Sequence, residues 1–463
     1  MNLKNKINKM SFELLRIVQL IGAEADKKGV NAYLVGGVVR DLVLNREIFD
    51  LDFVVEADAI LFAQSLQKKI KGALVVHERF GTASIIRKWP EKLGKCPHFD
   101  NKLKIDIATA RKEKYRNPAV LPDVESGNLQ EDLFRRDFTI NAMAVSLNAA
   151  SFGELLDPYA GIKDLKKGKI RVLHKKSLVD DPTRIFRAVR FEQRLKFKIS
   201  AETKKLIRSA VTKNMFGKTE KQRIRNELIL MFTEKYPEKT IRRMKALHEL
   251  RFIHEDIKIG RDIDRIYRSV RKTVSWYTKT DTLGSAIEIW ILNFMPLLTG
   301  LTLDKVKRIS IEFRFTRKES KVLLDFISNY EKIVESLSSV VAVSPGDIFD
   351  LLDKRSIETV IFCMAKTSSK KAIKRIKSFL LEYSNIVIEI TGNDLKKLGV
   401  SPGSQYKTIL KAVLRARLEG KVLTKKDEVN YVKNVFVSCC HPRRKAGLCR
   451  RHPERSEGSH KIL

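Results

Sequence analysis

Over its first 110 residues the chain alternates short apolar runs with segments of helical periodicity. Residues 11–29 place Leu15, Val18 and Ile21 at the spacing of an amphipathic helix. Apolar or alternating runs predict strands over residues 33–35, 50–55, 73–76, 82–86 and 103–108, with helices over 38–44 and 60–70. Residues 31–110 therefore predict a small mixed α/β domain. Inside this domain, residues 87–102 indicate a hairpin insertion. After it, residues 112–132 are polar and indicate a loop.

From about residue 163 onward helical periodicity dominates. The predicted helices cover residues 181–195, 204–211, 221–232, 241–250, 287–298 and 318–337, and residues 345–434 are also mostly helical. The predicted fold class is an α/β head with a mixed sheet, followed by an all-α neck, body and tail. We expect the head to cover residues 1–160, the neck 161–235, the body 236–380 and the tail 381–435.

Composition adds a strong positive charge, because 91 Lys and Arg residues outnumber 55 Asp and Glu residues by 36 in a chain of 463. That excess favours a polyanionic partner, either nucleic acid or an anionic membrane surface. The most apolar stretch, residues 286–303, is interrupted by Glu288, Asn293 and Pro296, so a membrane role has little support. The N-terminus lacks the unbroken apolar core of a signal peptide. Five cysteines are too few for a disulfide scaffold, which predicts a reducing cytosol.

The last segment, residues 436–463, is basic, has no helical period and predicts a disordered extension. Its cysteines and histidines invite a zinc interpretation, but adjacent Cys-Cys-His does not fit the spacing of structural zinc sites. The stretch RHPERSEGSH also resembles translated dispersed repeats at the ends of some bacterial reading frames. We therefore expect no zinc there, and we interpret Cys96 and Cys363 as structural. The residues of the rejected zinc site are Cys439, Cys440, His441, Cys449 and His452.

Two carboxylates stand out on the second predicted strand. Asp50 and Asp52 are two residues apart, so they point to the same face of a strand. Side by side they repel each other unless a cation lies between them, and Mg²⁺ prefers a few carboxylates together with substrate phosphates. Asp106, in a later apolar strand, supplies a third carboxylate if the two strands are neighbours. The alternative is a polar edge strand with a solvated face.

A glycine pair, Gly36-Gly37, lies between the first predicted strand and a helix that carries Arg40. Glycines at such a turn let backbone N–H groups approach a phosphate closely, and the helix start adds positive potential. The alternative is an ordinary strand-to-helix turn. The spacing is neither that of a P-loop nor that of a dinucleotide fingerprint.

Two further motifs carry arginines. In Arg135-Arg136-Asp137-Phe138-Thr139-Ile140-Asn141, Asp137 and Asn141 lie on one side of a helical turn and suit a ribose or a triphosphate. In residues 180–191 an acidic cap and Pro182 start a helix on which Arg184, Arg187 and Arg190 share one broad face. Because these arginines repel one another, we expect a triphosphate or Asp181 to face them. The alternatives are a capping arrangement and a solvated basic face.

The four motifs follow one another along the chain, from Gly36 to Phe191. Together they resemble the class II tRNA nucleotidyltransferases and bacterial poly(A) polymerases of the DNA polymerase beta superfamily. The similarity is high over residues 34–44, 49–55, 105–115, 135–144, 157–173 and 180–197. A weaker similarity, ITGNDLKKLGVSPG, lies within residues 390–422. The resemblance implies a polymerase beta-like head and a basic helical arm that grips RNA. It also implies template-independent, Mg²⁺-dependent addition of nucleotides with release of pyrophosphate.

The resemblance assigns roles residue by residue. Asp50 and Asp52 match the metal-binding catalytic carboxylates, with Asp106 as a third candidate. Asp181 and Arg184 match the pair that reads the base edge of CTP or ATP, although the family's usual Glu-Asp-x-x-Arg here begins with Asp180. The residues that match the segments for the triphosphate and ribose are Gly36, Gly37, Arg40, Arg135, Arg136, Asp137, Asn141, Arg187 and Arg190.

Four functions are compatible with this resemblance. A tRNA 3′-end nucleotidyltransferase, adding CCA, CC only or A only, is favoured by residues 77–83, HERFGTA, which look like the tRNA enzymes. The others are a poly(A) polymerase, a non-catalytic RNA-binding protein, which predicts loss of Asp50 or Asp52, and a bifunctional enzyme with a phosphohydrolase domain. No His-Asp pair in the helical arm supports the last. We therefore expect tRNA, CTP and ATP as partners, Mg²⁺ as cofactor, no stable protein partner and a cytoplasmic location.

Overall fold

The computed structural model describes the chain except for residues 49, 91–101, 248, 281–286 and 438–463. The chain forms two compact units, each built from two of its stretches. Unit 1 comprises Met1–Ser269 and Glu288–Ile327, and unit 2 comprises Val270–Ile287 and Ser328–Leu463. The finer division into head, neck, body and tail stays a prediction. The residues of the rejected zinc site and Cys96 lie outside the described residues, and Cys363 is buried with its thiol 3.8 Å from the carbonyl of Tyr330.

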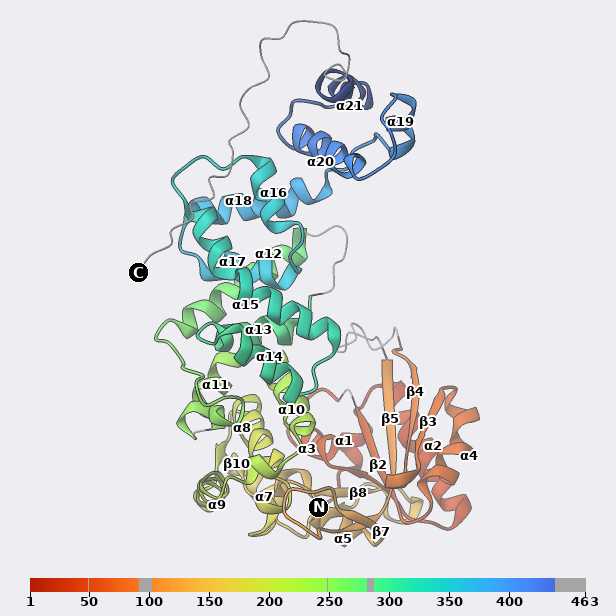
Figure 1. Ribbon diagram of the computed structural model, residues 1–463. Helices are drawn as coiled ribbons and strands as arrows, with labels where there is room; N and C mark the ends of the chain where they lie inside the picture. The colour runs from red at the N-terminus through yellow and green to blue at the C-terminus, as the bar shows by residue number, and fades with distance from the viewer. Residues whose placement is uncertain (49, 91–101, 248, 281–286, 438–463) are drawn as a thin grey trace, which may run out of the picture. The chain divides into compact units, whose positions relative to one another are not determined.

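A seven-stranded mixed sheet forms the centre of the N-terminal part of unit 1 (Figure 1). Only β2 and β5 run parallel, and the other neighbours are antiparallel. All five predicted strands and the mixed α/β head are confirmed, whereas β8 and β9 were not predicted. The strand order is β3 (Ala73–His77), β4 (Thr82–Lys88), β5 (Lys102–Thr109), β2 (Leu51–Val55), β1 (Ala32–Val35), β8 (Ala144–Ser146) and β9 (Leu155–Leu156).

The predicted hairpin insertion is confirmed at its base, because β4 and β5 pair as far as Lys88 and Lys102. The rest of that insertion, residues 91–101, lies outside the described residues. The predicted helices of the head are also confirmed, as α2 (Phe12–Lys28), α3 (Gly37–Val43) and α4 (Ala59–Ile70).

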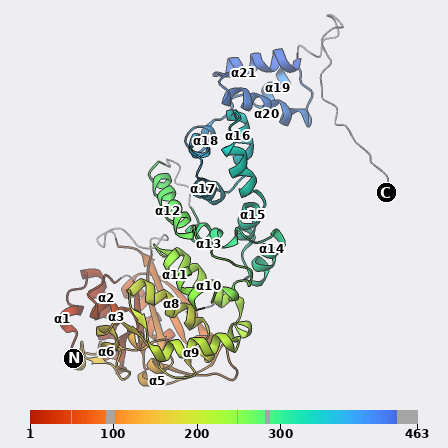
Figure 2. The same cartoon turned by 90° about the vertical axis from the view of Figure 1, so that its left-hand side faces the viewer.

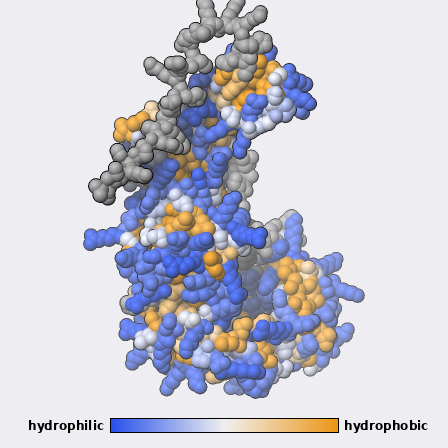
Figure 3. Space-filling model, viewed as in Figure 1, coloured by the Kyte–Doolittle hydropathy of each residue, from blue (hydrophilic) through white to orange (hydrophobic). Residues whose placement is uncertain are grey.

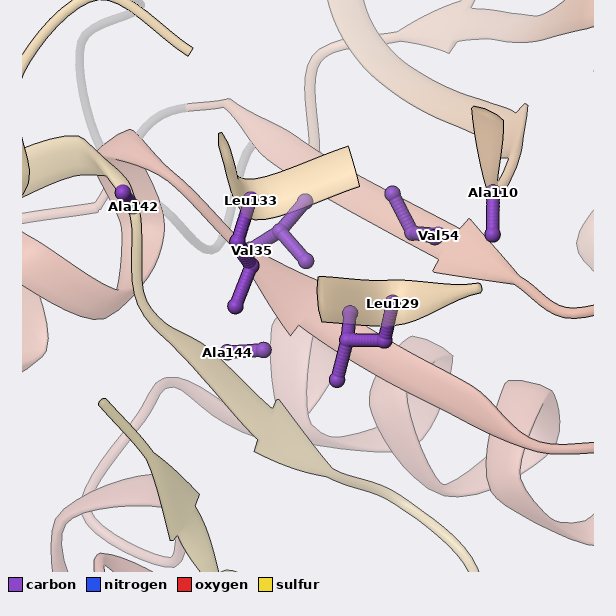
Figure 4. Close-up of a cluster of buried hydrophobic side chains, with 7 residues drawn as sticks. All are labelled: Val35, Val54, Ala110, Leu129, Leu133, Ala142 and Ala144. Carbon is purple, nitrogen blue, oxygen red and sulfur yellow. The ribbon is translucent and has the colours of Figure 1, made fainter. Parts of the chain in front are cut away.

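The prediction of a loop over residues 112–132 is wrong. These residues form the antiparallel pair β6 (Arg111–Lys114) and β7 (Asp123–Ser126), then the start of α5 (Leu129–Phe134). Asn128 and Glu131 form a capping box that starts α5, a signal that the polar composition concealed. Leu129 and Leu133 then pack this short helix onto β1 and β2 in a buried cluster (Figure 4).

Helices make up most of the rest of unit 1, as predicted. In Figure 2, α8 and α10 lie side by side, and they contact each other. The helix predicted over residues 241–250 ends early, at Ala246, and Glu249–Phe252 form a 3₁₀ turn. Buried Leu247 and Leu250 continue the apolar pattern across that break, which explains the error. The helices are α7 (Ser177–Asp180), α8 (Thr183–Leu195), α9 (Ala201–Thr212), α10 (Lys221–Thr233), α11 (Pro237–Ala246), α13 (Ile289–Leu298) and α14 (Leu303–Glu312).

Short elements complete unit 1, and two long helices continue into unit 2. The short elements are α1 (Lys4–Ile7), α6 (Gly161–Lys166) and a parallel pair of strands, β10 (Lys169–Ile170) and β11 (Lys198–Ile199). The two long helices are α12 (Ile263–Thr280) and α15 (Arg317–Ser338).

Unit 2 is helical in the part of the chain that the structure describes. Its C-terminal helices pack around Ile390, Leu395 and Val413. Glu428, fully buried, accepts hydrogen bonds from the backbone N–H of Ile390 and from Arg417. The helices are α16 (Pro345–Leu352), α17 (Ile357–Lys366), α18 (Lys370–Leu381), α19 (Gly392–Lys397), α20 (Gln405–Leu418) and α21 (Lys425–Val432), followed by a π-helical turn at Lys433–Val437.

The apolar stretch noted above is core rather than membrane. Every residue of α13 from Trp290 to Leu298 is buried in unit 1. Among the described residues, no helix is both long enough and apolar enough to cross a bilayer. Hydrophilic residues cover most of the face of the molecule seen in Figure 3.

Candidate nucleotide-binding site

One pocket of about 590 Å³ in unit 1 gathers almost every predicted site residue. It is lined by the turn between β1 and α3, by β2, by the segment after α5 and by helix α8. Asp106 alone among the predicted residues is not part of its lining. The predicted residues that line it are Gly36, Gly37, Arg40, Asp50, Asp52, Arg135, Arg136, Asp137, Asn141, Asp181, Arg184, Arg187 and Arg190.

The glycine turn makes room for an arginine. Gly36 has φ +71°, a conformation that L side chains rarely adopt. A Cβ built there would lie 2.7 Å from Nη1 at the end of the Arg136 side chain, so a larger residue would strain the backbone and displace this guanidinium. At Gly37 a Cβ would meet Arg40 at 3.6 Å, an ordinary contact. The turn therefore brings a fixed positive charge against its own backbone.

The carboxylates lie on neighbouring strands, as predicted. Asp52 on β2 pairs in register with Asp106 on β5, and Asp50 directly precedes β2. Burial, and next the carboxylate of Asp106, raise the pKa of Asp52 to about 6, with Arg136 opposing them. Asp106 is held on both oxygens, by Ser84 Oγ at 2.5 Å and by Lys104 Nζ at 2.7 Å.

The donor set at this edge of the sheet is therefore two carboxylates. Within the described residues, no group of three or more His, Cys, Asp and Glu side chains is arranged to hold a metal ion. Asp50 and Asp52 leave the remaining positions of a cation to water or to oxygens of a substrate, which is the way Mg²⁺ is usually bound. Burial first, and then the carboxylates of Asp106 and Asp50, raise the pKa of Asp52, and a divalent cation would oppose these effects.

The arginines of α8 already face anions that belong to the protein. Arg187 donates to Asp137 from Nε at 2.8 Å and from Nη2 at 2.6 Å, and it also pairs with Glu227 of α10 at 3.1 Å. Arg190 pairs with the same Glu227 at 3.3 Å. Two carboxylates distant in sequence, rather than Asp181, therefore pair with Arg187 and Arg190. That a triphosphate also faces these arginines stays a prediction.

Asp137 and Asn141 are held together, as their spacing predicted. Nδ2 of Asn141 donates to Asp137 at 3.0 Å, and Oδ1 of Asn141 accepts from Arg40 Nη1 at 2.8 Å. Burial alone would raise the pKa of Asp137, but Arg187 and the Asn141 hydrogen bond outweigh it and lower that pKa to about 2. Asp137 is thus a permanent anion that links the head to α8.

The side chains of Asp181 and Arg184 do not bond each other, although the backbone N–H of Arg184 donates to the carbonyl of Asp181 at 3.2 Å. Oδ1 of Asp181 accepts from the backbone N–H of Thr183 at 3.0 Å, from Thr183 Oγ1 at 2.6 Å and pairs with Arg223 at 2.7 Å. Asp181, which precedes the N-cap residue Pro182, therefore accepts from the first N–H of α8 as its position suggested, and Oδ2 takes no part in these contacts. Arg184 donates to Ser177 Oγ and to the carbonyl of Arg135, both at 2.6 Å.

Sequence reasoning missed several lining residues. The guanidinium carbons of Arg40, Arg187 and Arg190 lie 5.3, 5.6 and 5.0 Å from the ring centroid of Phe191, which the i, i+4 spacing from Arg187 would have suggested. Arg111 and Glu113 lie two residues apart on β6 and both line the pocket. They were missed because residues 112–132 were interpreted as a loop. The missed residues are Phe80, Arg111, Glu113, Tyr115, Leu121, Pro122, Phe191, Arg194 and Arg223.

A mixed sheet with an Asp-x-Asp strand, a glycine turn and an arginine-bearing helix on one pocket defines a nucleotidyltransferase head of the polymerase beta type. The family model described as Poly A polymerase head domain matches residues 32–171. A solved structure of a CCA-adding enzyme in an apo form is 32% identical, has a TM-score of 0.77 and covers 94% of this chain and 99% of its own. The chain belongs to the class II tRNA nucleotidyltransferase family.

Two curated relatives differ in length. The A-adding tRNA nucleotidyltransferase of Geobacter sulfurreducens is 38% identical over 417 residues, which is 88% of this chain but only 46% of the relative. The A-adding tRNA nucleotidyltransferase of Halalkalibacterium halodurans is 29% identical over 429 residues, 91% of this chain and 92% of the relative. The chain thus spans about half the length of the first relative and nearly all of the second.

The raised pKa of Asp52 predicts a pH-dependent stability. The unfolded chain ionises this carboxyl near its ordinary pKa of 3.8, whereas the folded chain does so near 6. Wild-type stability therefore falls as pH rises through this interval, and Asp52→Asn removes that loss. In EDTA we expect Asp52→Asn to melt higher than wild type at pH 7 and nearly equally below about pH 4. Thermal melts across this range check it, and a difference that does not change with pH would contradict it.

Proposed function

We propose that this protein is a tRNA nucleotidyltransferase that adds nucleotides of the 3′-terminal CCA, with addition of A as the favoured specificity. The observation that carries the proposal is a pocket that combines the carboxylates of Asp50 and Asp52 with several arginines held by ion pairs and hydrogen bonds. The relatives named above support tRNA as the acceptor and ATP as a donor. If the enzyme adds the complete CCA end, CTP is a second nucleotide donor.

In this proposal Asp50 and Asp52 hold Mg²⁺. Besides burial, the negative charge of Asp106 acts on the neighbouring carboxyl of Asp52 and raises its pKa. Bound there, Mg²⁺ would activate the RNA 3′-hydroxyl and stabilise the pyrophosphate that leaves. Arg40 and Arg136 present positive charge to the triphosphate beside the glycine turn. Because Asp41, Asn141 and Asp132 already hold these guanidinium groups, they need little reorganisation when charge develops.

Asp181 and Arg184 are proposed to read the base. Oδ2 of Asp181 is the acceptor that can meet a base amino group. A guanidinium carries five N–H donors, so the contacts of Arg184 with Ser177 and Arg135 leave donors for a base acceptor. Selection of the nucleotide would then come from protein rather than from a template. The proposed place of action is the reducing cytosol.

Two other functions have less support. A poly(A) polymerase shares the head domain, but the relatives named above are tRNA enzymes. A non-catalytic RNA-binding protein has no need for Asp50 and Asp52, and both line the pocket. The number of nucleotides added to the RNA distinguishes a poly(A) polymerase from the proposed tRNA nucleotidyltransferase.

We test the proposal with tRNA transcripts that end either at the discriminator base or in CC, each with ATP, CTP or both. An A-adding enzyme extends only the CC-ended transcript, by one A, while a CCA-adding enzyme completes both. Asp50→Asn and Asp52→Asn should each reduce incorporation by more than about a thousandfold, because the proposed metal ligands are lost. Long adenylate tails would favour a poly(A) polymerase. Full activity of both variants would contradict the assignment of Asp50 and Asp52 as metal ligands.

A second experiment separates base reading from capping at Asp181. Asp181→Ala should cost about 1 kcal/mol of stability as a lost cap. It should also blur the preference for the correct nucleotide about ten- to a hundredfold, because hydrogen bonds in the pocket are lost. The matched control is Thr183→Val, which removes a contact to Asp181 Oδ1 and leaves the base-facing oxygen in place.

Values of kcat/KM for all four nucleotides, measured beside the melting temperature, decide the point. We expect Thr183→Val to lose stability with unchanged selectivity. If Asp181→Ala behaves in the same way, Asp181 is a cap alone and base reading by this residue is wrong.

A further inference from the structure

A second pocket, of about 520 Å³, lies beside the nucleotide pocket in unit 1. The two share Glu113, Tyr115, Arg135 and Arg184 in their linings, so they are separated only by these side chains. None of the roles proposed above uses the second pocket. A nucleotide strand whose end reaches the first pocket would therefore have a neighbouring place for its next unit.

An aromatic platform forms one side of this pocket. Phe134 stacks on His174 with ring centroids 4.9 Å apart and an interplanar angle of 26°, and Tyr159 lies 5.8 Å away. Phe134 is 45% exposed although the preceding residue, Leu133, is 1% exposed. Since Leu133 anchors α5 in the sheet cluster of Figure 4, the ring of Phe134 is held in place while it stays exposed to a ligand.

Polar and charged groups complete the lining. Lys112, Arg135, Lys176 and Arg184 bring positive charge, partly offset by Glu113, Glu131 and Asp180. The amides of Asn128 and Gln130 bring donors and acceptors. Burial, and then Arg184 and Lys176, lower the pKa of His174, so its ring is neutral near pH 7 and offers one donor and one acceptor. Stacking surface, hydrogen-bonding edges and cations together are the chemistry that recognises an unpaired nucleotide.

We propose that this pocket binds an unpaired nucleotide close to the 3′ end of the RNA substrate, with its base stacked on Phe134. The proposal rests on the function proposed above. An RNA nucleotide is favoured over a second free nucleotide because the two pockets adjoin, which suits two linked units of one strand. The lysines at this pocket then face the strand's phosphates.

The test uses the full chain and an acceptor-stem RNA that ends in CC. Three versions carry a photoreactive base, 5-iodouridine at the unpaired position before CC or 5-iodocytidine at either C. After irradiation, mass spectrometry locates the crosslinked residue. We expect one of the three RNAs to crosslink to Phe134, His174 or Tyr159, and 8-azido-ATP to label residues of the first pocket instead.

Steady-state kinetics supply the second readout. Phe134→Leu keeps an apolar side chain but removes the ring, so we expect the KM for RNA to rise about ten- to a hundredfold while the KM for ATP stays unchanged. Phe134→Tyr, the matched control, should restore both the crosslink and the wild-type KM. An unchanged melting temperature is expected for both variants, because Phe134 is exposed.

Two results would overturn the proposal. One is an unchanged KM for RNA in Phe134→Leu, with crosslinks confined to other residues. The other is labelling of this pocket by 8-azido-ATP with a raised KM for ATP, which would make it a site for a free nucleotide. Crosslinking needs no turnover, so a wild-type enzyme that fails to extend tRNA contradicts the proposed function without deciding this test.

Discussion

The pocket depends on one ion pair, between the buried carboxylate of Asp137 and the partly exposed guanidinium of Arg187. Asp137 follows helix α5 in the head, and Arg187 lies 50 residues later on α8. Removal of Arg187 would leave the buried carboxylate of Asp137 uncompensated, which costs up to about 3–5 kcal/mol. Through Asn141 the pair also holds Arg40, and through Glu227 it holds Arg190. A single network thus positions the glycine turn of the head and the arginines of α8.

This network explains how one pocket accommodates so many arginines. The arginines are not left to repel one another, since Asp132, Asp137 and Glu227 lie among them. Asp132 is fully buried, so Arg135 and Arg136 are fixed rather than mobile. A triphosphate would meet positive groups whose orientation is already set, which is the arrangement that favours charge developing in a transition state.

Local signals predicted the parts of this site but not its connections. The strand, the glycine pair, Asp50, Asp52 and the helix with three arginines could be predicted because each depends on spacing of a few residues. The partners of the arginines could not, because Asp137 and Glu227 reach Arg187 across 50 and 40 positions. For the same reason the platform of Phe134 and His174, from separate segments, left no pattern in the sequence. The prediction for residues 112–132 failed for another reason: β6 and β7 consist mostly of charged and polar residues, as a loop does.

The most direct test of the central claim is a double-mutant cycle on Asp137→Asn and Arg187→Met. The free energy of unfolding from urea titrations and the KM for ATP are measured for wild type, both single variants and the double variant. If the pair organises the pocket, the coupling energy in stability is about 2–3 kcal/mol, and each single variant raises the KM as much as the double variant does. Additive effects, with coupling below about 0.5 kcal/mol, would contradict it.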